Sequence, residues 1–219
     1  MSGRASGPWT TGDIDRAYDA IAPHYDGWDA LPEALGVGRL RCGLVGQARG
    51  EVLDVATGTG KNLGYIPRGC RVTAIDASQA MLDLAHEHAG YPGLNAAFLT
   101  GDAEHLPFAD GRFDTVVSSL STCTFVSPVA ALCEMGRVCR PAGEGGRVLL
   151  MEHGRSNLAA LGWWQDVRAA GHAQLVGCHW NRQPLDLVRQ SGLTVLSSHR
   201  YVLGIYHVIV AAPTAPAGS

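Results

Sequence analysis

Lysine is almost absent from this sequence of 219 residues, in which Lys61 is the single example. The 17 basic side chains are outnumbered by 20 acidic ones, which leaves a formal net charge of −3, and the arginines form no consecutive run. A protein that binds a phosphate backbone needs a basic face, because each neutralised phosphate adds affinity. We therefore expect no nucleic-acid partner.

Long apolar segments and paired cysteines are missing as well. No apolar stretch reaches the ~20 residues of a membrane span, and the first ten residues lack the apolar centre of a secretion signal. The six cysteines show no C-x-x-C spacing and mostly lie in apolar stretches. We expect a cytoplasmic protein with no membrane anchor, with reduced, inert thiols that include Cys123 and Cys178, and with no metal site. The alternative is a metal site formed by His153, His172, Cys178 and His179, but these residues include no helical i, i+4 pair.

Short apolar runs alternate with helical patterns along most of the chain, which is typical of helices covering both faces of a parallel sheet. We expect an α/β fold of the Rossmann-like, doubly wound type with a mostly parallel seven-stranded sheet. The expected strands are Glu51–Val55, Cys70–Ile75, Ala96–Leu99, Phe113–Ser118 and Arg147–Met151, and the expected helices are Ser78–His88, Pro128–Cys139, Leu158–Gln174 and Pro184–Gln190.

The two ends of this pattern differ from its middle. Strands at Leu193–His199 and Gly204–Ala211 are so close in sequence that they favour an antiparallel pair. Asp13–Leu44 is helical, broken by Pro23 and Pro32, and is expected to form a lid over the sheet. We expect one domain over residues 12–212, with flexible ends at 1–11 and 213–219.

The strongest motif joins a strand to a glycine-rich turn, Glu51–Gly60, with the sequence EVLDVATGTG. Glycines let a ligand approach the main chain. A dinucleotide fingerprint has a third glycine where this chain has Leu63, which disfavours an NAD-dependent oxidoreductase. S-adenosylmethionine (SAM) is another cofactor bound by such loops, and it has no phosphate for a third glycine to seat. Asp54 is placed to take its ammonium group, directly or through water, and the loop to meet the rest of its methionine part.

Two further acidic residues end the next strands. Asp76 suits both hydroxyls of a ribose, because a carboxylate offers two acceptor oxygens. Asp102 suits the exocyclic amine of adenine, and Ala103 leaves room for the ring. These acids at successive strand ends favour SAM over NAD.

The order of these blocks, over about Asp13–Met151, resembles the class I SAM-dependent methyltransferases, and Tyr18–Asp26 resembles the front segment of the ubiquinone/menaquinone C-methyltransferase group. That resemblance implies that Tyr18 and Tyr25 close over the cofactor and that Thr59, Asp76, Asp102, Ala103 and Ser119 contact it. The full set expected to bind SAM is Tyr18, Tyr25, Asp54, Ala56, Thr57, Gly58, Thr59, Gly60, Asn62, Asp76, Ala77, Met81, Gly101, Asp102, Ala103, Ser119 and Leu120.

A second resemblance is more specific. Gly60–Thr73, Met151–His153 and Gly177–Cys178 are similar to the methyltransferase-like thiol S-methyltransferases of animals. Members of that family carry an apolar N-terminal anchor, which we do not expect in this protein. The Glu-His-Gly-Arg and Cys-His-Trp-Asn-Arg blocks also resemble phospholipid-type N-methyltransferases of bacteria. The acceptor atom therefore stays open at this point.

Methyl transfer from a sulfonium mainly requires the acceptor to be held in line, and a thiol ionises with modest help. His153, His179 and His24, in that order, are the candidate bases or orienting groups. Trp163, Trp164 and Trp180 are candidates for an aromatic acceptor pocket, although helical spacing favours core packing for the first two.

The sequence thus favours a SAM-dependent enzyme that methylates a small-molecule acceptor, a thiol first, and yields S-adenosylhomocysteine. The alternatives are a carbon or amine acceptor, such as a quinone ring, and a non-catalytic SAM-binding partner protein. The composition suggests a bacterial source, where tailoring of specialised metabolites is common, and the chain is expected to be a monomer or a homodimer.

Overall fold

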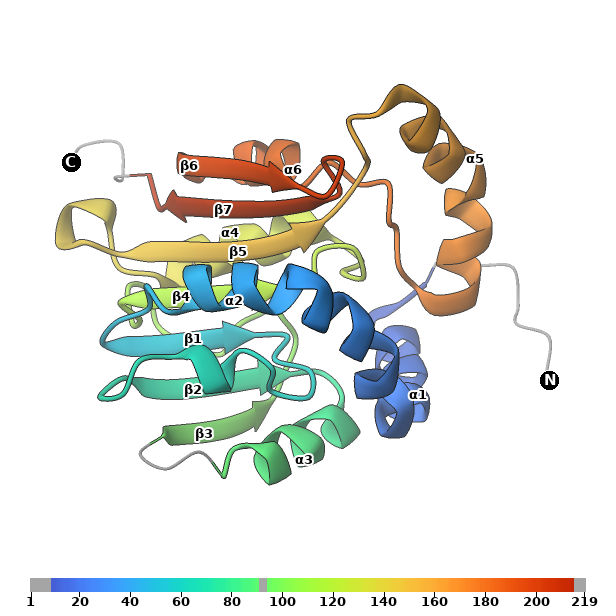
Figure 1. Cartoon of the computed structure of the whole chain (residues 1–219). Helices are drawn as coiled ribbons and strands as arrows, with labels where there is room; N and C mark the ends of the chain where they lie inside the picture. The colour runs from blue at the N-terminus through green and yellow to red at the C-terminus, as the bar shows by residue number, and fades with distance from the viewer. Residues whose placement is uncertain (1–8, 91–93, 215–219) are drawn as a thin grey trace.

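The computed structural model describes residues 9–90 and 94–214, apart from the side chains of residues 28 and 29. Within these residues seven strands form one sheet in the order β3-β2-β1-β4-β5-β7-β6 (Figure 1). The first five strands run parallel, and β7 lies antiparallel between β5 and β6. The bounds are β1 (Glu51–Val55), β2 (Arg71–Asp76), β3 (Asn95–Thr100), β4 (Thr115–Ser119), β5 (Arg147–His153), β6 (Thr194–Tyr201) and β7 (Tyr206–Ala212). The expected fold class is confirmed.

Helices cover both faces of the sheet, and each face has its own apolar core. One core contains side chains of α4 and α6, and the other contains side chains of α2. Figure 1 shows α1 and α5 beside the edge toward which the parallel strands point. The helices are α1 (Thr11–Pro32), α2 (Gly38–Val45), α3 (Gln79–His88), α4 (Pro128–Val138), α5 (Ala159–Val176) and α6 (Pro184–Gln190), with short turns η1 (Glu33–Val37), η2 (Leu63–Tyr65) and η3 (Ala142–Glu144).

The central strands β1, β4 and β5 are almost entirely buried. Strands covered on both faces are expected to be continuously apolar, which is why short apolar runs located them. The fourth strand begins two residues later than predicted. Phe113 instead forms an isolated bridge with Cys139, and its side chain is 1% exposed in the core.

The expected break of the lid at Pro23 was wrong, because α1 continues through that residue. The helix is held on both sides of the proline. Asp19 accepts a hydrogen bond from the hydroxyl of Ser78 at the start of α3, and Asp26 accepts one from Thr59 in the glycine loop at 2.7 Å. These contacts compensate for the hydrogen bond that a proline removes from a helix. The kink falls at Gly36 instead, whose φ of 134° favours glycine.

The ends of the chain are described only in part. The expected flexible segments 1–11 and 213–219 lie mostly outside the described residues, and α1 already begins at Thr11. Of the helices described, none is both long and apolar enough to cross a bilayer.

Candidate active site

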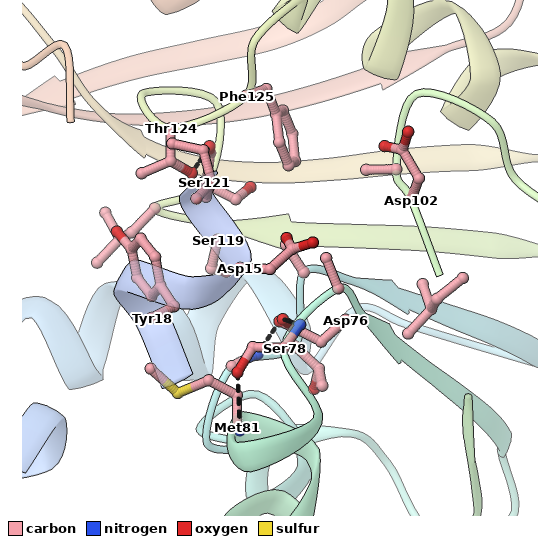
Figure 2. A pocket seen from close by; sticks show the side chains of 18 of the residues that line it. Asp15, Tyr18, Asp76, Ser78, Met81, Asp102, Ser119, Ser121, Thr124 and Phe125 are labelled. Atoms are coloured by element: carbon pink, nitrogen blue, oxygen red, sulfur yellow. Dashed lines mark hydrogen bonds between the residues drawn. The ribbon is translucent and has the colours of Figure 1, made fainter. Parts of the chain in front are cut away.

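A pocket opens where the parallel strands end, between the sheet and α1 (Figure 2). Its empty space is about 1000 Å³, a volume that includes the part open to solvent. In open α/β sheets ligands bind beyond the carboxyl ends of the strands, so this is the expected place. The predicted cofactor residues that line it are Tyr18, Tyr25, Ala56, Thr57, Gly58, Thr59, Asn62, Asp76, Ala77, Met81, Gly101, Asp102, Ala103, Ser119 and Leu120.

The carboxylate of Asp76 is built into the glycine loop. The backbone N–H of Gly58 donates to its Oδ2 at 2.8 Å, and that of Ser78 donates to its Oδ1 at 2.9 Å. Burial raises the pKa of Asp76. Each oxygen keeps acceptor capacity after its backbone bond, so the carboxylate can still accept both hydroxyls of a ribose.

The glycine turn after β1 leaves space where a cofactor would lie. Gly58 has a φ of 56°, and a Cβ at this position would meet no atom within 4 Å. Asp102 also lines the pocket, with its Oδ1 accepting from the backbone N–H of Glu104 at 2.9 Å. An acid beside the small residues Gly101 and Ala103 fits an adenine ring. The residues present therefore fit SAM.

Asp54 lies behind the pocket wall rather than in it. Its side chain is completely buried, and it accepts hydrogen bonds from Thr57 Oγ1 at 2.6 Å and Asn62 Nδ2 at 2.7 Å. Burial raises its pKa to about 6. Of the two contacts expected with an ammonium group, direct or through water, the direct one is not what the geometry offers, because Asp54 holds the two pocket residues Thr57 and Asn62.

Gly60, the other predicted residue that does not line the pocket, forms the inner side of the turn. Its φ is 81°, and an added Cβ would lie 3.0 Å from Leu63 Cδ1 and 3.2 Å from the Cα of Ala85. The glycine thus permits close packing of the turn on α3, which is a structural role.

Alanine substitutions at the two loop glycines are expected to differ in whether they mainly reduce stability or mainly weaken SAM binding. Gly60→Ala adds steric overlap to backbone strain and is expected to lower the free energy of unfolding by about 2–4 kcal/mol. Gly58→Ala adds strain alone, about 1–2 kcal/mol, but puts a methyl group into the cofactor space and weakens SAM binding more. Urea unfolding and calorimetric titration with SAM measure the two effects. A larger stability loss at Gly58 than at Gly60 would contradict this assignment.

The sequence reasoning missed four charged residues that line the pocket, Asp15, Arg41, Lys61 and Glu104. Asp15 of α1 lines the pocket, and its Oδ1 is buried without a hydrogen-bond partner among the described residues. Burial, and then the charges of Asp19 and Asp102, raise its pKa. Arg41 is 3% exposed and donates to Asn62 Oδ1 at 2.7 Å and to Glu33 Oε1 at 2.6 Å, and its buried Nε, which has no hydrogen-bond partner among the described residues, suits the carboxylate of an amino acid. Asp15 lies one helical turn before Tyr18, a spacing that could have identified it.

The loop after β4 forms the far wall of the pocket through Ser121, Thr124 and Phe125 (Figure 2). Behind it, the fully buried Glu152 accepts from the backbone N–H groups of Ser121 and Thr122 at 3.1 Å and from Thr122 Oγ1 at 2.8 Å. Burial raises the pKa of Glu152 to about 7.

Arg182 holds the same loop from the other side. It donates to the carbonyl oxygens of Thr122 and of Phe125, the latter at 2.9 Å. Glu152 and Arg182 therefore shape the pocket without lining it, and no local pattern of residues indicates this role.

None of the three predicted histidines lines the pocket. His24 is exposed on α1. His179 lies behind the loop after β4, where its backbone N–H donates to the carbonyl of Cys123 at 2.9 Å, and burial lowers its pKa. His153 faces Cys178, with 3.5 Å between Nε2 and Sγ. A direct role as base is therefore not supported by their positions.

The predicted aromatic acceptor pocket is also absent from the lining. Trp180 stacks on His172 and contacts Trp164, with ring centroids 4.0 and 5.2 Å away. Trp163 is 65% exposed on α5. These rings surround the segment after α5 instead of the cofactor pocket.

Comparisons with known proteins agree with this geometry. A family model described as "Methyltransferase domain" matches residues 53–145. The chain is 29% identical to "Methyltransferase OMS1, mitochondrial" of Saccharomyces cerevisiae over 91% of this chain and 46% of that protein. It is 33% identical to "Demethylmenaquinone methyltransferase" of Thermobifida fusca over 77% of this chain and 70% of that protein. It thus spans about half the length of the yeast relative.

Solved structures extend the likeness over the whole chain. The "[4+2]-Cyclase SpnF" superposes with a TM-score of 0.73 at 18% identity, covering 98% of this chain and all of that one. A similarity at this level of identity shows the fold alone, since one fold hosts many reactions.

Proposed function

Because the chain belongs to the class I SAM-dependent methyltransferases, we propose that it transfers the methyl group of SAM to the sulfur of a small-molecule thiol. SAM supplies an electrophilic methyl group on a sulfonium. The protein has to hold the donor and the acceptor in line, and positioning alone can contribute about 7–11 kcal/mol to such a reaction.

The pocket residues divide this positioning between them. Asp76 is placed for the ribose and Asp102 for the adenine, while Arg41 and the glycine loop suit the amino-acid end. Tyr18 and Tyr25 belong to α1, and their rings lie 6.0 Å apart over the pocket. We propose that they cover the donor and exclude water from it.

The observation that carries the choice of acceptor is the kind of base in the pocket, where carboxylates such as Asp15 and Glu104 are present. No histidine or cysteine is among the described residues that line it. A thiol with a pKa near ~8.5 is partly ionised at neutral pH, whereas a phenol or an activated carbon needs a base to remove its proton. The similarity of Gly60–Thr73 to thiol S-methyltransferases supports the same acceptor.

A second candidate is methylation of a quinol-like ring carbon. Its support is the name of the Thermobifida relative and the position of Asp15, whose raised pKa and unpartnered buried oxygen suit a general base. In this case Asp15→Asn is expected to lower turnover by about 100-fold or more.

Turnover with a panel of acceptors distinguishes the two candidates. We expect S-adenosylhomocysteine to be released with small alkyl thiols at least about tenfold faster than with quinols, phenols and amines. The reason is that a thiol is partly ionised at neutral pH without a catalytic base. Reactions without acceptor, and with a variant that binds no SAM, provide the background. Turnover on quinols alone, lost in Asp15→Asn, would replace the thiol with the second candidate.

The wider context is proposed on the sequence alone. We place the enzyme in the cytoplasm of a bacterium, as one domain over residues 12–212, acting as a monomer or homodimer in the tailoring of specialised metabolites. The yeast relative's name assigns that protein to mitochondria.

A further inference from the structure

Three side chains with metal-binding atoms meet at one point beside the pocket. Cys123 belongs to the loop after β4, His153 is the last residue of β5, and Cys178 follows α5. Their sulfur and nitrogen atoms all lie within 4.8 Å of one another, and Nε2 of His153 is 3.5 Å from Sγ of Cys178. Three separate segments thus bring two thiols and an imidazole together.

These distances match what a tetrahedral zinc ion requires. With Zn–S of about 2.3 Å and Zn–N of about 2.0 Å, ligand atoms lie about 3.5 Å apart for sulfur and nitrogen and about 3.8 Å apart for two sulfurs. The observed cluster therefore needs side-chain movements of at most about 1 Å to close on an ion. The Sγ of Cys123 now contacts the carbonyl of Leu120 at 3.6 Å, a weak interaction that an ion would replace.

The cluster adjoins the far wall of the pocket. Cys123 lies between Thr122 and Thr124, in the loop that supplies the far wall, and Tyr18 of the lid interacts electrostatically with both thiols. Arg182, which interacts with the same two sulfurs, adds a positive charge that offsets an excess of thiolates. The cluster and the pocket therefore share the loop after β4, which carries Cys123 on one side and Thr124 on the other.

We propose that Cys123, His153 and Cys178 form a zinc site with an open fourth position, in which the sulfur of the acceptor binds. Two cysteines and one histidine with an open position form the ligand set of a catalytic zinc site rather than of a closed structural one. The identity of the fourth ligand rests on the thiol acceptor proposed above, whereas the metal site itself does not.

The chemistry balances without any oxidant or reductant. The acceptor thiol loses its proton to solvent when it binds the ion, because a coordinating thiol is deprotonated. The zinc-bound sulfur forms the new bond to the methyl carbon, and the old carbon–sulfur bond breaks with its electron pair going to the sulfur of the donor. The products are a thioether, S-adenosylhomocysteine and one proton.

Metal content tests the site without any turnover. The full chain, purified with reductant and without chelator, is expected to hold one zinc per molecule and to bind added zinc in competition with a chromophoric chelator. Cys123→Ser and Cys178→Ser are expected to weaken this binding by more than about 100-fold, since loss of a mere supporting group already costs 10–100-fold. Cys42→Ser, at an exposed cysteine on α2, is the matched control and should bind like the wild type.

Cobalt in place of zinc tests the fourth position. Addition of an alkyl thiol to the cobalt-loaded protein, with no SAM present, is expected to change the visible absorption bands as sulfur replaces water. Circular dichroism in the presence of EDTA shows whether the variants remain folded. His153→Gln provides a second ligand variant in case the buried serine at 123 prevents folding.

Several results would overturn the proposal. It fails if the reduced wild type binds no zinc, the result expected if Cys123 and Cys178 served only as a disulfide pair. It also fails if both serine variants bind zinc like the wild type. If the absorption bands of the cobalt-loaded protein do not change when the alkyl thiol is added, the acceptor sulfur is not the fourth ligand. If the bands change on addition of the thiol but the protein shows no turnover with thiols, the proposed function is wrong while the proposed metal site stands.

Discussion

Asp76→Ala is expected to weaken the binding of SAM by at least about 100-fold. The carboxylate keeps acceptor capacity for two ribose hydroxyls, and hydrogen bonds to a charged group contribute about 1.5–3 kcal/mol each. It also accepts from the N–H of Gly58, so its loss releases the glycine loop that meets the cofactor. Isothermal titration with SAM and with S-adenosylhomocysteine measures the change in Kd directly.

Asp83→Ala is the matched control for this experiment. Asp83 lies on the following helix, α3, where its side chain is exposed and accepts a hydrogen bond from Gln79 at 2.8 Å. Its replacement should leave the Kd for SAM within about twofold, because surface substitutions change free energies by less than about 0.5 kcal/mol. If Asp76→Ala bound SAM as tightly as Asp83→Ala, the placement of the ribose on Asp76 would be wrong.

Glu152→Ala is expected to lower the free energy of unfolding by about 3–5 kcal/mol. It leaves three buried donors of Ser121 and Thr122 without an acceptor, and each such donor costs about 1–3 kcal/mol. Since these donors set the loop after β4, turnover should fall by more than the binding of SAM. Urea unfolding gives the first quantity, and kinetics with titration calorimetry give the second.

Glu152→Gln separates the hydrogen bonds from the charge. All three strong bonds end on Oε2, so the amide oxygen of a glutamine can accept them while its NH₂ group takes the place of Oε1. We expect it to cost about 1 kcal/mol, the net contribution of a single hydrogen bond. Equal losses in the alanine and glutamine variants would show that the carboxylate, and not its geometry, stabilises the loop.

The cofactor site was predictable because it follows from rules that act locally. A strand, a glycine turn and an acid at the end of the next strand are each visible within a few residues, as at Gly58 and Asp76. Parallel strands carry their carboxyl ends to one edge, so these short signals meet in space without further information. Nearly all the residues predicted to bind SAM line the pocket for this reason.

The errors arose where a residue's surroundings, and not its neighbours in sequence, decide its role. Asp54 has the sequence position of a ligand-binding acid, yet its burial commits it to Thr57 and Asn62. Pro23 has the properties of a helix breaker, but contacts of Asp19 and Asp26 with other elements hold the helix together. Local propensity is a weak prior that tertiary contacts override.

By itself the sequence determined the class of fold, the nature of the cofactor and the strand ends that hold it, because glycine conformations and strand order are short-range properties. Only the tertiary structure decided that the predicted histidines lie outside the pocket, that Asp15 points into it, and that Cys123 and Cys178 meet at His153. Those positions depend on how the loops after β4 and α5 pack on the sheet, and such packing joins residues that no spacing in the sequence connects.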